Sequence, residues 1–338
     1  MGTGHRALGR EGLDVTDWRA ERDRALLTLE REKRPAFRAE AAEQLHHLAA
    51  EAPSRAADFM EVVPRLLSDS QPEVKRSGVA LATVVLPPEE MTALLIARLR
   101  DEESLVRLEA TGRLADLARP ELRGALAGML EDSVPEVRFE AARGIAALKH
   151  PAGLEVLIDA LDADLLRFRA LGALAELEDP RALPAVKRLF GRWLLPAFDR
   201  TQAAGVLAKL GDSDGVTHLF QRSRKKWSQD RALAVELLGE VKAPGALERL
   251  KAILDDVKDS CRGAAARGLG RLGDTRALPW LVALLKDTSA QEEDRLDAAD
   301  GLWRLGGPES REHVRAAVST FTSPEARQEL EELFQEDT

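Results

Sequence analysis

The sequence predicts an all-α fold, a right-handed α-solenoid of about ten stacked helical hairpins, and two observations carry this prediction. An arginine recurs at steps of 31, 29, 33, 31, 31 and 33 residues. An alanine follows each of these arginines by three residues, and a leucine or isoleucine follows by seven. A fixed period of this length is typical of stacked helical repeats. We call the recurring residues the arginine ladder: Arg107, Arg138, Arg167, Arg200, Arg231, Arg262 and Arg295.

Each period contains the signals of a turn, a helix A, a short A–B loop and a helix B. Around residue 273, Gly273 can end one helix, Asp274 can cap the next, and Pro279 stands in its first turn, where no backbone N–H is needed. After each ladder arginine, apolar residues fall at helical spacing and predict one buried stripe on helix B. We therefore expect helical hairpins and no strand.

The periodicity extends almost to both ends of the chain. It predicts one repeat domain over residues 13–338, with an N-terminal capping hairpin at 13–50 and a more polar C-terminal one at 307–338. Residues 1–12 show no periodicity, and we expect a disordered tail there.

Composition excludes several classes of protein. No segment approaches 18 apolar residues and Met1–Arg10 has no apolar run, so we expect neither a membrane span nor a signal peptide but a cytoplasmic protein. The excess of arginine over lysine and the abundant alanine favour a GC-rich bacterial genome. The single cysteine excludes an internal disulfide framework, and Cys261 occupies an apolar position of the repeat, which predicts a buried thiol.

The turn motifs resemble those of HEAT repeats, specifically the short repeats of phycobilisome-lyase-type HEAT-like proteins. The resemblance rests on the segments Gly273–Pro279 and Pro135–Arg138, with a variant of the second at Pro72–Lys75, and it covers residues 35–335. It implies a helical repeat fold. The family includes bilin lyases and isomerases, adaptors and scaffolds, so the resemblance implies no single activity.

For the arginine ladder we expect a structural role. A guanidinium group suits carboxylates and carbonyls at helix ends, and we expect partners at the starts of neighbouring repeats, such as Asp179, Asp212 and Asp274. A phosphate-binding row of arginines is the alternative.

No motif for catalysis or metal binding is present. The six histidines lack metal-ligand spacing, and no P-loop or nucleophile elbow occurs. Residues 268–273 match Gly-x-Gly-x-x-Gly, but they fall within a predicted helix B and its C-cap and not after a strand. We therefore expect no catalytic residue, no metal, no cofactor and no enzymatic activity.

Charge is distributed unevenly along the chain. The chain carries −9 in total, yet residues 181–231 contain eleven Lys and Arg against four Asp, a net charge of +7. Two adjacent A–B loops in this stretch each carry a tryptophan among basic residues. They predict a basic–aromatic edge that binds a partner, formed by Lys187, Arg188, Arg192, Trp193, Arg222, Arg224, Lys225, Lys226 and Trp227. Alternatively, the cations stabilise helix C-termini and the tryptophans fill gaps in the core.

A second candidate surface lies on helix B. The residue after the ladder arginine is large and apolar in three successive repeats, at Leu108, Phe139 and Phe168. These side chains could form an apolar patch for a partner helix, or they could pack against the neighbouring helix B.

The prediction for function is a non-enzymatic protein-interaction scaffold or adaptor whose basic–aromatic edge binds an acidic protein partner. Binding of nucleic acid or another polyanion through the same edge is the alternative, and a bilin-lyase-like enzyme is the third hypothesis.

Overall fold

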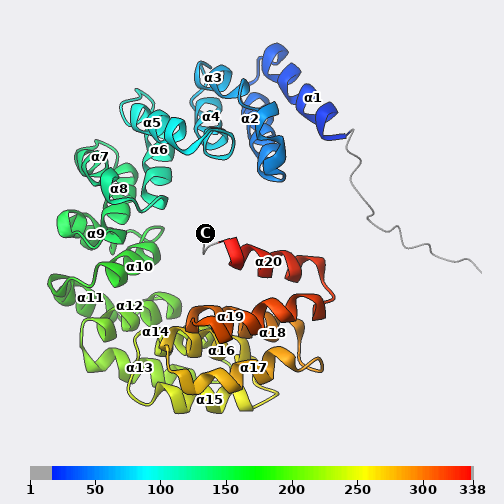
Figure 1. Cartoon of the computed structure of the whole chain (residues 1–338). Coiled ribbons are helices and arrows are strands. Elements are labelled where there is room, and N and C mark those ends of the chain that lie inside the picture. Colours follow the sequence, from blue (N-terminus) through cyan, green and yellow to red (C-terminus); the bar gives the residue numbers. More distant parts are fainter. Residues whose placement is uncertain (1–16, 336–338) are drawn as a thin grey trace, which may run out of the picture. The chain divides into compact units, whose positions relative to one another are not determined.

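The computed structural model describes residues 17–335, and these residues form helices joined by turns, without a strand. The predicted all-α repeat fold is confirmed: the described residues contain twenty α-helices, which pair into ten hairpins (Figure 1). The predicted tail at residues 1–12 lies outside the described residues. The chain divides into two compact units, Met1–Val156 and Leu157–Thr338, and each is described by itself. The single domain over residues 13–338 stays a prediction.

The first unit holds four hairpins, in which the odd-numbered helices are A and the even-numbered are B. Its helices are α1 (Asp17–Arg31), α2 (Pro35–Ala50), α3 (Val62–Leu67), α4 (Pro72–Val85), α5 (Pro88–Arg98), α6 (Ser104–Asp116), α7 (Arg123–Gly128) and α8 (Pro135–Ala147). The next helix, α9 (Leu154–Ala160), crosses the boundary between the units.

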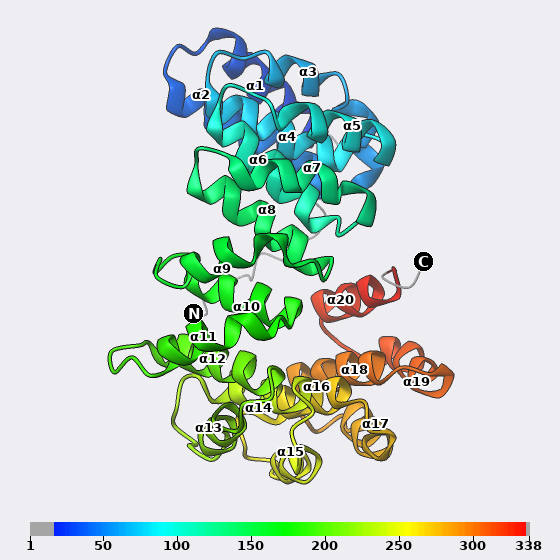
Figure 2. The ribbon, with the colours of Figure 1, turned by 90° about the vertical axis from the view of Figure 1, so that its left-hand side faces the viewer.

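The second unit continues the alternation. Its helices are α10 (Arg167–Leu177), α11 (Leu183–Phe190), α12 (Ala197–Lys209), α13 (Ser213–Ser223), α14 (Arg231–Glu240), α15 (Ala246–Asp255), α16 (Arg262–Leu272), α17 (Leu278–Lys286), α18 (Glu292–Leu305), α19 (Pro308–Ala317) and α20 (Pro324–Gln335). The B helices α14, α16 and α18 form one layer and the A helices α13, α15 and α17 the other (Figure 2). Alanine and leucine fill the space between the layers, and Cys261 is buried there.

Seven B helices, those that carry a ladder arginine, are each followed by a residue with positive φ, eleven positions after that arginine. Glycine occupies this position at Gly211, Gly273 and Gly306. Elsewhere a residue with a side chain adopts the same positive φ, at Ala118, Lys149, Glu178 and Lys242. The left-handed residue reverses the chain toward the next helix A, where an aspartate caps the first turn in three repeats. The caps are Asp179, Asp212 and Asp274, which accept the backbone N–H of Arg181, Asp214 and Arg276.

Five of the seven ladder arginines join their repeat to the next through hydrogen bonds. Arg107 donates to the backbone carbonyls of Asp101 and Glu102 in its own A–B loop, at 2.9 and 3.0 Å. It also donates through Nε and Nη2 to both carboxylate oxygens of Asp132 in the following loop, at 2.7 and 3.1 Å. These hydrogen bonds lower the pKa of Asp132 and raise that of Arg107. One side chain thus closes its own loop and joins it to its neighbour.

The predicted carboxylate partners of the ladder were wrong. Asp179 and Asp274 pair with the nearby Arg181 and Arg276, and Asp212 pairs with Lys187. Four of the ladder arginines instead reach carboxylates in the next A–B loop or at the next helix B start, because they stand at the beginning of helix B and not at its end. These acceptors are Asp132, Asp199, Asp259 and Asp294.

Glycines set the close packing of the B helices in the second unit. A Cβ added at Gly239 would lie 1.9 Å from the carbonyl oxygen of Gly268, and one at Gly270 would lie 2.2 Å from that of Gly301. The backbone of α16 is therefore in direct contact with the backbones of α14 and α18. Gly268 and Gly270 belong to the segment that resembles a dinucleotide-binding motif, and the structure places it in α16 and its C-cap.

Candidate functional site

Two tryptophans project from consecutive A–B loops of the second unit. Trp193 in loop 191–196 is 86% exposed and Trp227 in loop 224–230 is 98% exposed. Neither therefore fills a gap in the core, unlike Trp18 and Trp303, which are each 8% exposed. Exposure of a large aromatic surface is costly in water, so this pair marks the edge as a candidate binding surface.

Loop 191–196 is held by Arg200, a ladder arginine that, within residues 17–335, donates only to backbone carbonyl oxygens. Arg200 donates to the carbonyl oxygens of Phe190 and Arg192, both at 2.5 Å, and to that of Trp193 at 3.4 Å. Its guanidinium group thus holds the backbone that carries Trp193. Unlike Arg167 and Arg231, it donates to no carboxylate of the next repeat among the described residues.

In the ladder pattern Arg200 would pair with Asp230 of the following loop. The carboxylate of Asp230 instead accepts hydrogen bonds from other side chains. Asp230 is fully buried and accepts from Arg222, from Ser228 and, at 2.5 Å, from Thr201. Burial alone would raise the pKa of Asp230, but the hydrogen bonds from Arg222, Ser228 and Thr201 outweigh it and lower the pKa to about 2. This network fixes loop 224–230 to the start of α12.

Two predicted members of the basic–aromatic edge lie elsewhere. The Arg222 side chain is only 20% exposed and forms an ion pair with Asp230. Its positive charge is therefore neutralised within the protein. Lys187 donates to Asp212 at 2.6 Å, and this places its ammonium group at the start of α13, the opposite end of the hairpin from the A–B loops. Sequence spacing could not reveal either contact, because both partners are 8 or more residues away.

The remaining cations differ in how they are paired. Arg192 pairs with Asp162, and Lys226 with Asp256 at 3.1 Å, so each links its loop to a neighbouring loop. The others, Arg188, Arg224 and Lys225, are exposed and have no carboxylate partner among residues 17–335. We call the set that the structure leaves on this side the loop edge: Arg188, Arg192, Trp193, Arg224, Lys225, Lys226 and Trp227.

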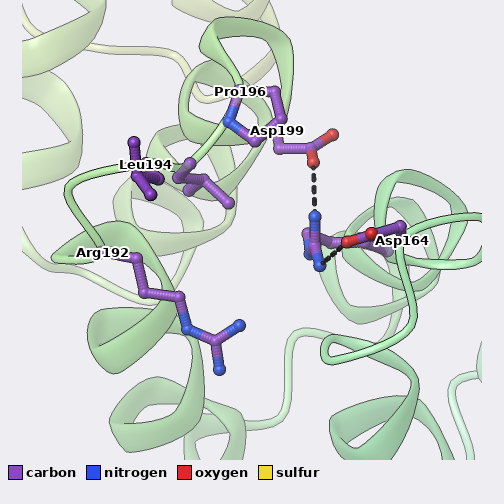
Figure 3. Close-up of a pocket in the computed structure, with 7 residues that line it drawn as sticks. Asp164, Arg192, Leu194, Pro196 and Asp199 are labelled. Carbon is purple, nitrogen blue, oxygen red and sulfur yellow. Dashed lines mark hydrogen bonds and ion pairs between the residues drawn. The ribbon is translucent and has the colours of Figure 1, made fainter.

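A pocket of about 530 Å³ lies beside loop 191–196. Figure 3 shows Arg192, Leu194 and Pro196 around one side of it and Asp164 on the opposite side. Arg167, which also lines the pocket, donates to Asp164 at 2.5 Å and to Asp199 at 3.1 Å. The lining therefore combines apolar side chains of loop 191–196 with charged groups.

The second predicted surface, on helix B, is not an exposed patch. Phe139 is 1% exposed, and Leu108 is partly buried against the core of the first unit. Only Phe168, in the second unit, is substantially exposed, at 44%. The prediction of an apolar patch was wrong at Phe139, because that side chain is buried.

A charged cluster on the B layer of the second unit was missed by the sequence reasoning. Glu236 of α14 accepts from Arg267 at 2.9 Å and from Arg271 at 2.7 Å, both of α16, and Arg267 also pairs with Asp297 of α18. Burial raises the pKa of Asp297 even beside Arg267. A signal did exist, because Arg267 and Arg143 each stand five residues after a ladder arginine, and Arg143 likewise pairs with Glu140 and Asp116.

The described residues offer little for metal chemistry or membrane spanning. Among residues 17–335, no three His, Cys, Asp or Glu side chains are grouped in a way that could hold a metal ion. No helix in the same range combines the length and apolar content needed to cross a bilayer.

The fold and the arginine ladder define a helical repeat protein of the α-solenoid class. Two family models match the chain: HEAT repeats at residues 92–167 and 219–303, and the PBS lyase HEAT-like repeat at residues 166–191. The chain belongs to the HEAT-repeat proteins, and the resemblance inferred from its turn motifs is confirmed. Such a scaffold fold supports a role in protein interaction.

Comparison with solved structures gives matches at low sequence identity. The complex of CpcE and CpcF of phycocyanin lyase from Nostoc sp. PCC7120 is 21% identical, with a TM-score of 0.48, over 70% of this chain and 97% of that chain. Human deoxyhypusine hydroxylase is 17% identical, with a TM-score of 0.32, over 73% and 96%. Kap95p, in its complex with RanGDP, is 12% identical, with a TM-score of 0.45; the match covers 98% of this chain and 52% of Kap95p. No curated protein shows significant sequence similarity to the chain.

One expectation is overturned by these comparisons. The absence of catalytic motifs led us to expect that the chain is not an enzyme. Residues 166–191, however, match a repeat type that is named for a lyase, so that expectation was wrong. The expectation rested on a search for metal, nucleotide and nucleophile patterns alone.

Proposed function

We propose that this chain is a protein-interaction scaffold whose loop edge binds an acidic protein partner. The observation that carries the proposal is the pair of tryptophans, Trp193 and Trp227, that stand almost wholly in solvent on consecutive loops. Aromatic side chains at the centre of an interface provide large apolar contact areas, and basic residues around them favour an acidic surface.

The unpaired cations supply the charge complementarity. Arg188, Arg224 and Lys225 lie close to the tryptophans in the chain and have no ion pair within the described part of the protein. Their positive charge is free to accelerate association with an acidic partner. The paired cations Arg192 and Lys226 instead stiffen the loops.

The test is affinity capture from an extract of the source cells with a charge-reversed edge. The variant R224E/K225E changes two exposed residues and no internal ion pair. The matched control R100E/R123E makes the same change of charge at two exposed arginines of the first unit, which also have no ion pair among residues 17–335. We expect the edge variant, and not the control, to lose a partner that the unaltered protein captures. Equal capture by all three proteins would refute the proposal.

Nucleic acid would use the same edge differently. Three unpaired cations would give a shallow salt dependence, with a slope of log K against log salt of about −2 for a single strand. Titration of a single-stranded oligonucleotide between about 50 and 200 mM salt measures this slope. A slope of about −2 that R224E/K225E flattens would favour nucleic acid over protein.

A lyase-type activity is a second candidate function, favoured by the match of residues 166–191 to the PBS lyase HEAT-like repeat. This segment runs from Leu166 to Gly191 and ends at the loop that carries Trp193. The test is an absorption spectrum of the protein after mixing with a linear tetrapyrrole. A shifted spectrum that W193A abolishes would support this candidate, and an unshifted spectrum would count against it.

A further inference from the structure

The exposed apolar residues of the second unit form a row at the repeat period. Among the described residues, the large apolar side chains with the highest exposure are Leu165 at 94%, Trp193 at 86%, Leu194 at 73%, Trp227 at 98% and Val257 at 73%. The other exposed large apolar side chains reach only 45%. All five lie on four consecutive A–B loops, at residues 161–166, 191–196, 224–230 and 256–261.

Polar contacts show that these four loops are neighbours in order. Asp162 in the first loop pairs with Arg192 in the second. Thr201, at the start of the helix after the second loop, donates to Asp230 in the third at 2.5 Å.

The third loop is joined to the fourth in the same way. Lys226 pairs with Asp256 at 3.1 Å, and the buried pair of Arg231 with Asp259 connects the same two repeats at 2.6 Å. The row is therefore a continuous feature of one edge.

Exposed apolar residues that are scattered singly are ordinary on protein surfaces, but a row aligned by the fold is not. The other A–B loops that the structure describes carry no exposed large apolar residue; in loop 99–103, for example, Leu99 is 7% exposed, and Phe321 in the last loop is 2% exposed. Core packing cannot explain the row, since these side chains contribute almost nothing to the core.

We propose that this row, together with the unpaired cations Arg188, Arg224 and Lys225, docks an extended acidic polypeptide segment with a large apolar residue at every third position. The inference rests on the proposed function and specifies the partner. Neighbouring helices pack about 8–10 Å apart. An extended segment in the polyproline II conformation advances about 3.1 Å per residue with three residues per turn, so every third side chain points to the same side. Every third residue of such a segment thus meets one loop, and the acidic residues between them lie beside the cations.

The pocket beside Leu194 favours an extended segment over a helix. Its volume of about 530 Å³ holds one or two side chains, and its apolar wall of Leu194, Leu195 and Pro196 ends at Arg192. An extended segment can place one apolar side chain there and a carboxylate near the guanidinium group. A docked helix needs a continuous apolar trough, and the row consists of projecting side chains on separate loops.

Two blocked synthetic peptides of about ten residues test the spacing. Both contain the same number of leucines and glutamates; one has leucine at every third position, and the other has the leucines adjacent. Binding to the full chain is followed by tryptophan fluorescence, since burial of Trp193 and Trp227 shifts their emission to the blue. We expect the spaced peptide to bind about tenfold more tightly. Equal affinity, or binding of neither peptide, overturns the inference.

Variants at the ends of the row separate this inference from the proposed function. L165S and V257S remove the outer contacts without disturbing buried groups, and each is expected to weaken the spaced peptide about three- to tenfold. The control I96S removes an aliphatic side chain that is 42% exposed in the first unit and should bind as the unaltered protein does. If W193A and W227A abolish binding while L165S and V257S do not, the extended row is wrong and the proposed function stands.

Lipid vesicles test whether an anionic membrane, and not a polypeptide segment, binds to the same row of side chains. Sedimentation with vesicles of phosphatidylcholine and phosphatidylserine reports whether the exposed tryptophans and cations bind an anionic membrane instead. We expect no vesicle binding that depends on Leu165 or Val257. Cosedimentation that L165S or V257S abolishes would overturn the peptide-docking inference.

Discussion

Arg231 and Asp259 form a bidentate ion pair in which both side chains are almost completely buried. Nη1 and Nη2 of Arg231 donate to the two carboxylate oxygens at 2.6 and 2.7 Å, and the side chains are 3% and 4% exposed. Nε donates to the carbonyl oxygen of Ser223. Although burial opposes it, the hydrogen bonds from Arg231 lower the pKa of Asp259. The pair closes one loop and joins it to the next repeat.

Removal of one partner of this pair should destabilise the protein strongly. R231A leaves a buried carboxylate without a counter-charge, and we expect a loss of about 3–5 kcal/mol in the free energy of unfolding. Urea unfolding followed by circular dichroism measures it. The control R224A, at an exposed arginine of the preceding loop, should change stability by less than about 0.5 kcal/mol. A similar small loss for both variants would contradict a structural role of the ladder.

Glycine packing between the B helices gives a second prediction. In G270A the added Cβ would lie 2.2 Å from the Gly301 carbonyl oxygen, so the helices must separate and stability should fall by about 1–3 kcal/mol. Gly172 in α10 is the matched control, since no atom lies within 4 Å of a Cβ there. G172A should therefore raise stability by about 0.5–1 kcal/mol. Thermal unfolding of both variants measures the contrast, and a shift of the same sign in both would count against close backbone packing.

Acid should weaken the network around Asp230. The pKa of this carboxyl is lowered from 3.8 to about 2 in the folded protein, so its contribution is present above pH 4 and is lost as pH falls from about 4 to 2. The shift corresponds to about 2 kcal/mol. Comparison of urea unfolding at several pH values with that of D230N isolates this term. If the difference between the two proteins does not change over this range, the assignment is wrong.

Arg200 should control the mobility of the loop that carries Trp193. In R200A the carbonyl oxygens of Phe190 and Arg192 lose their shared donor, so backbone amides of residues 191–196 should exchange hydrogen faster. Hydrogen exchange followed by mass spectrometry measures this. The control R188A removes an exposed arginine close to the same loop and should leave the exchange unchanged. Unchanged exchange in R200A would show that the loop is held by other contacts.

The sequence predicted the repeat well because the arginine, alanine and leucine that recur with its period are residue types that the packing of the helices requires. Ala110 and Leu114, which follow Arg107 at the predicted spacing, are both fully buried. The positive-φ residue that follows seven of the B helices was only partly visible, since Lys149 and Glu178 occupy it where glycine does elsewhere. The seven ladder arginines located seven of the ten B helices that the structure describes, and the other three followed from extending the period toward both ends of the chain.

The candidate site was harder to predict, because its composition depends on contacts between residues far apart in sequence. The sequence located Trp193 and Trp227 in adjacent loops but could not distinguish the free Lys225 from Arg222, whose charge is bound by Asp230. Nor could it show that Leu165 and Val257 project from the same edge, since an apolar residue in a loop usually packs inward. Phe139 failed for the opposite reason, because its side chain is buried whereas Phe168, at the same position of the next repeat, is exposed.

The rate of association between this protein and the partner captured from its source cells tests the central proposal most directly. Stopped-flow measurements over a range of ionic strength would compare the unaltered protein, R224E/K225E and R100E/R123E. We predict a rate constant that falls with salt for the unaltered protein and the control, and a slower rate with a flattened or inverted salt dependence for the edge variant. The same rate constant and the same salt dependence for all three proteins would contradict binding through the loop edge.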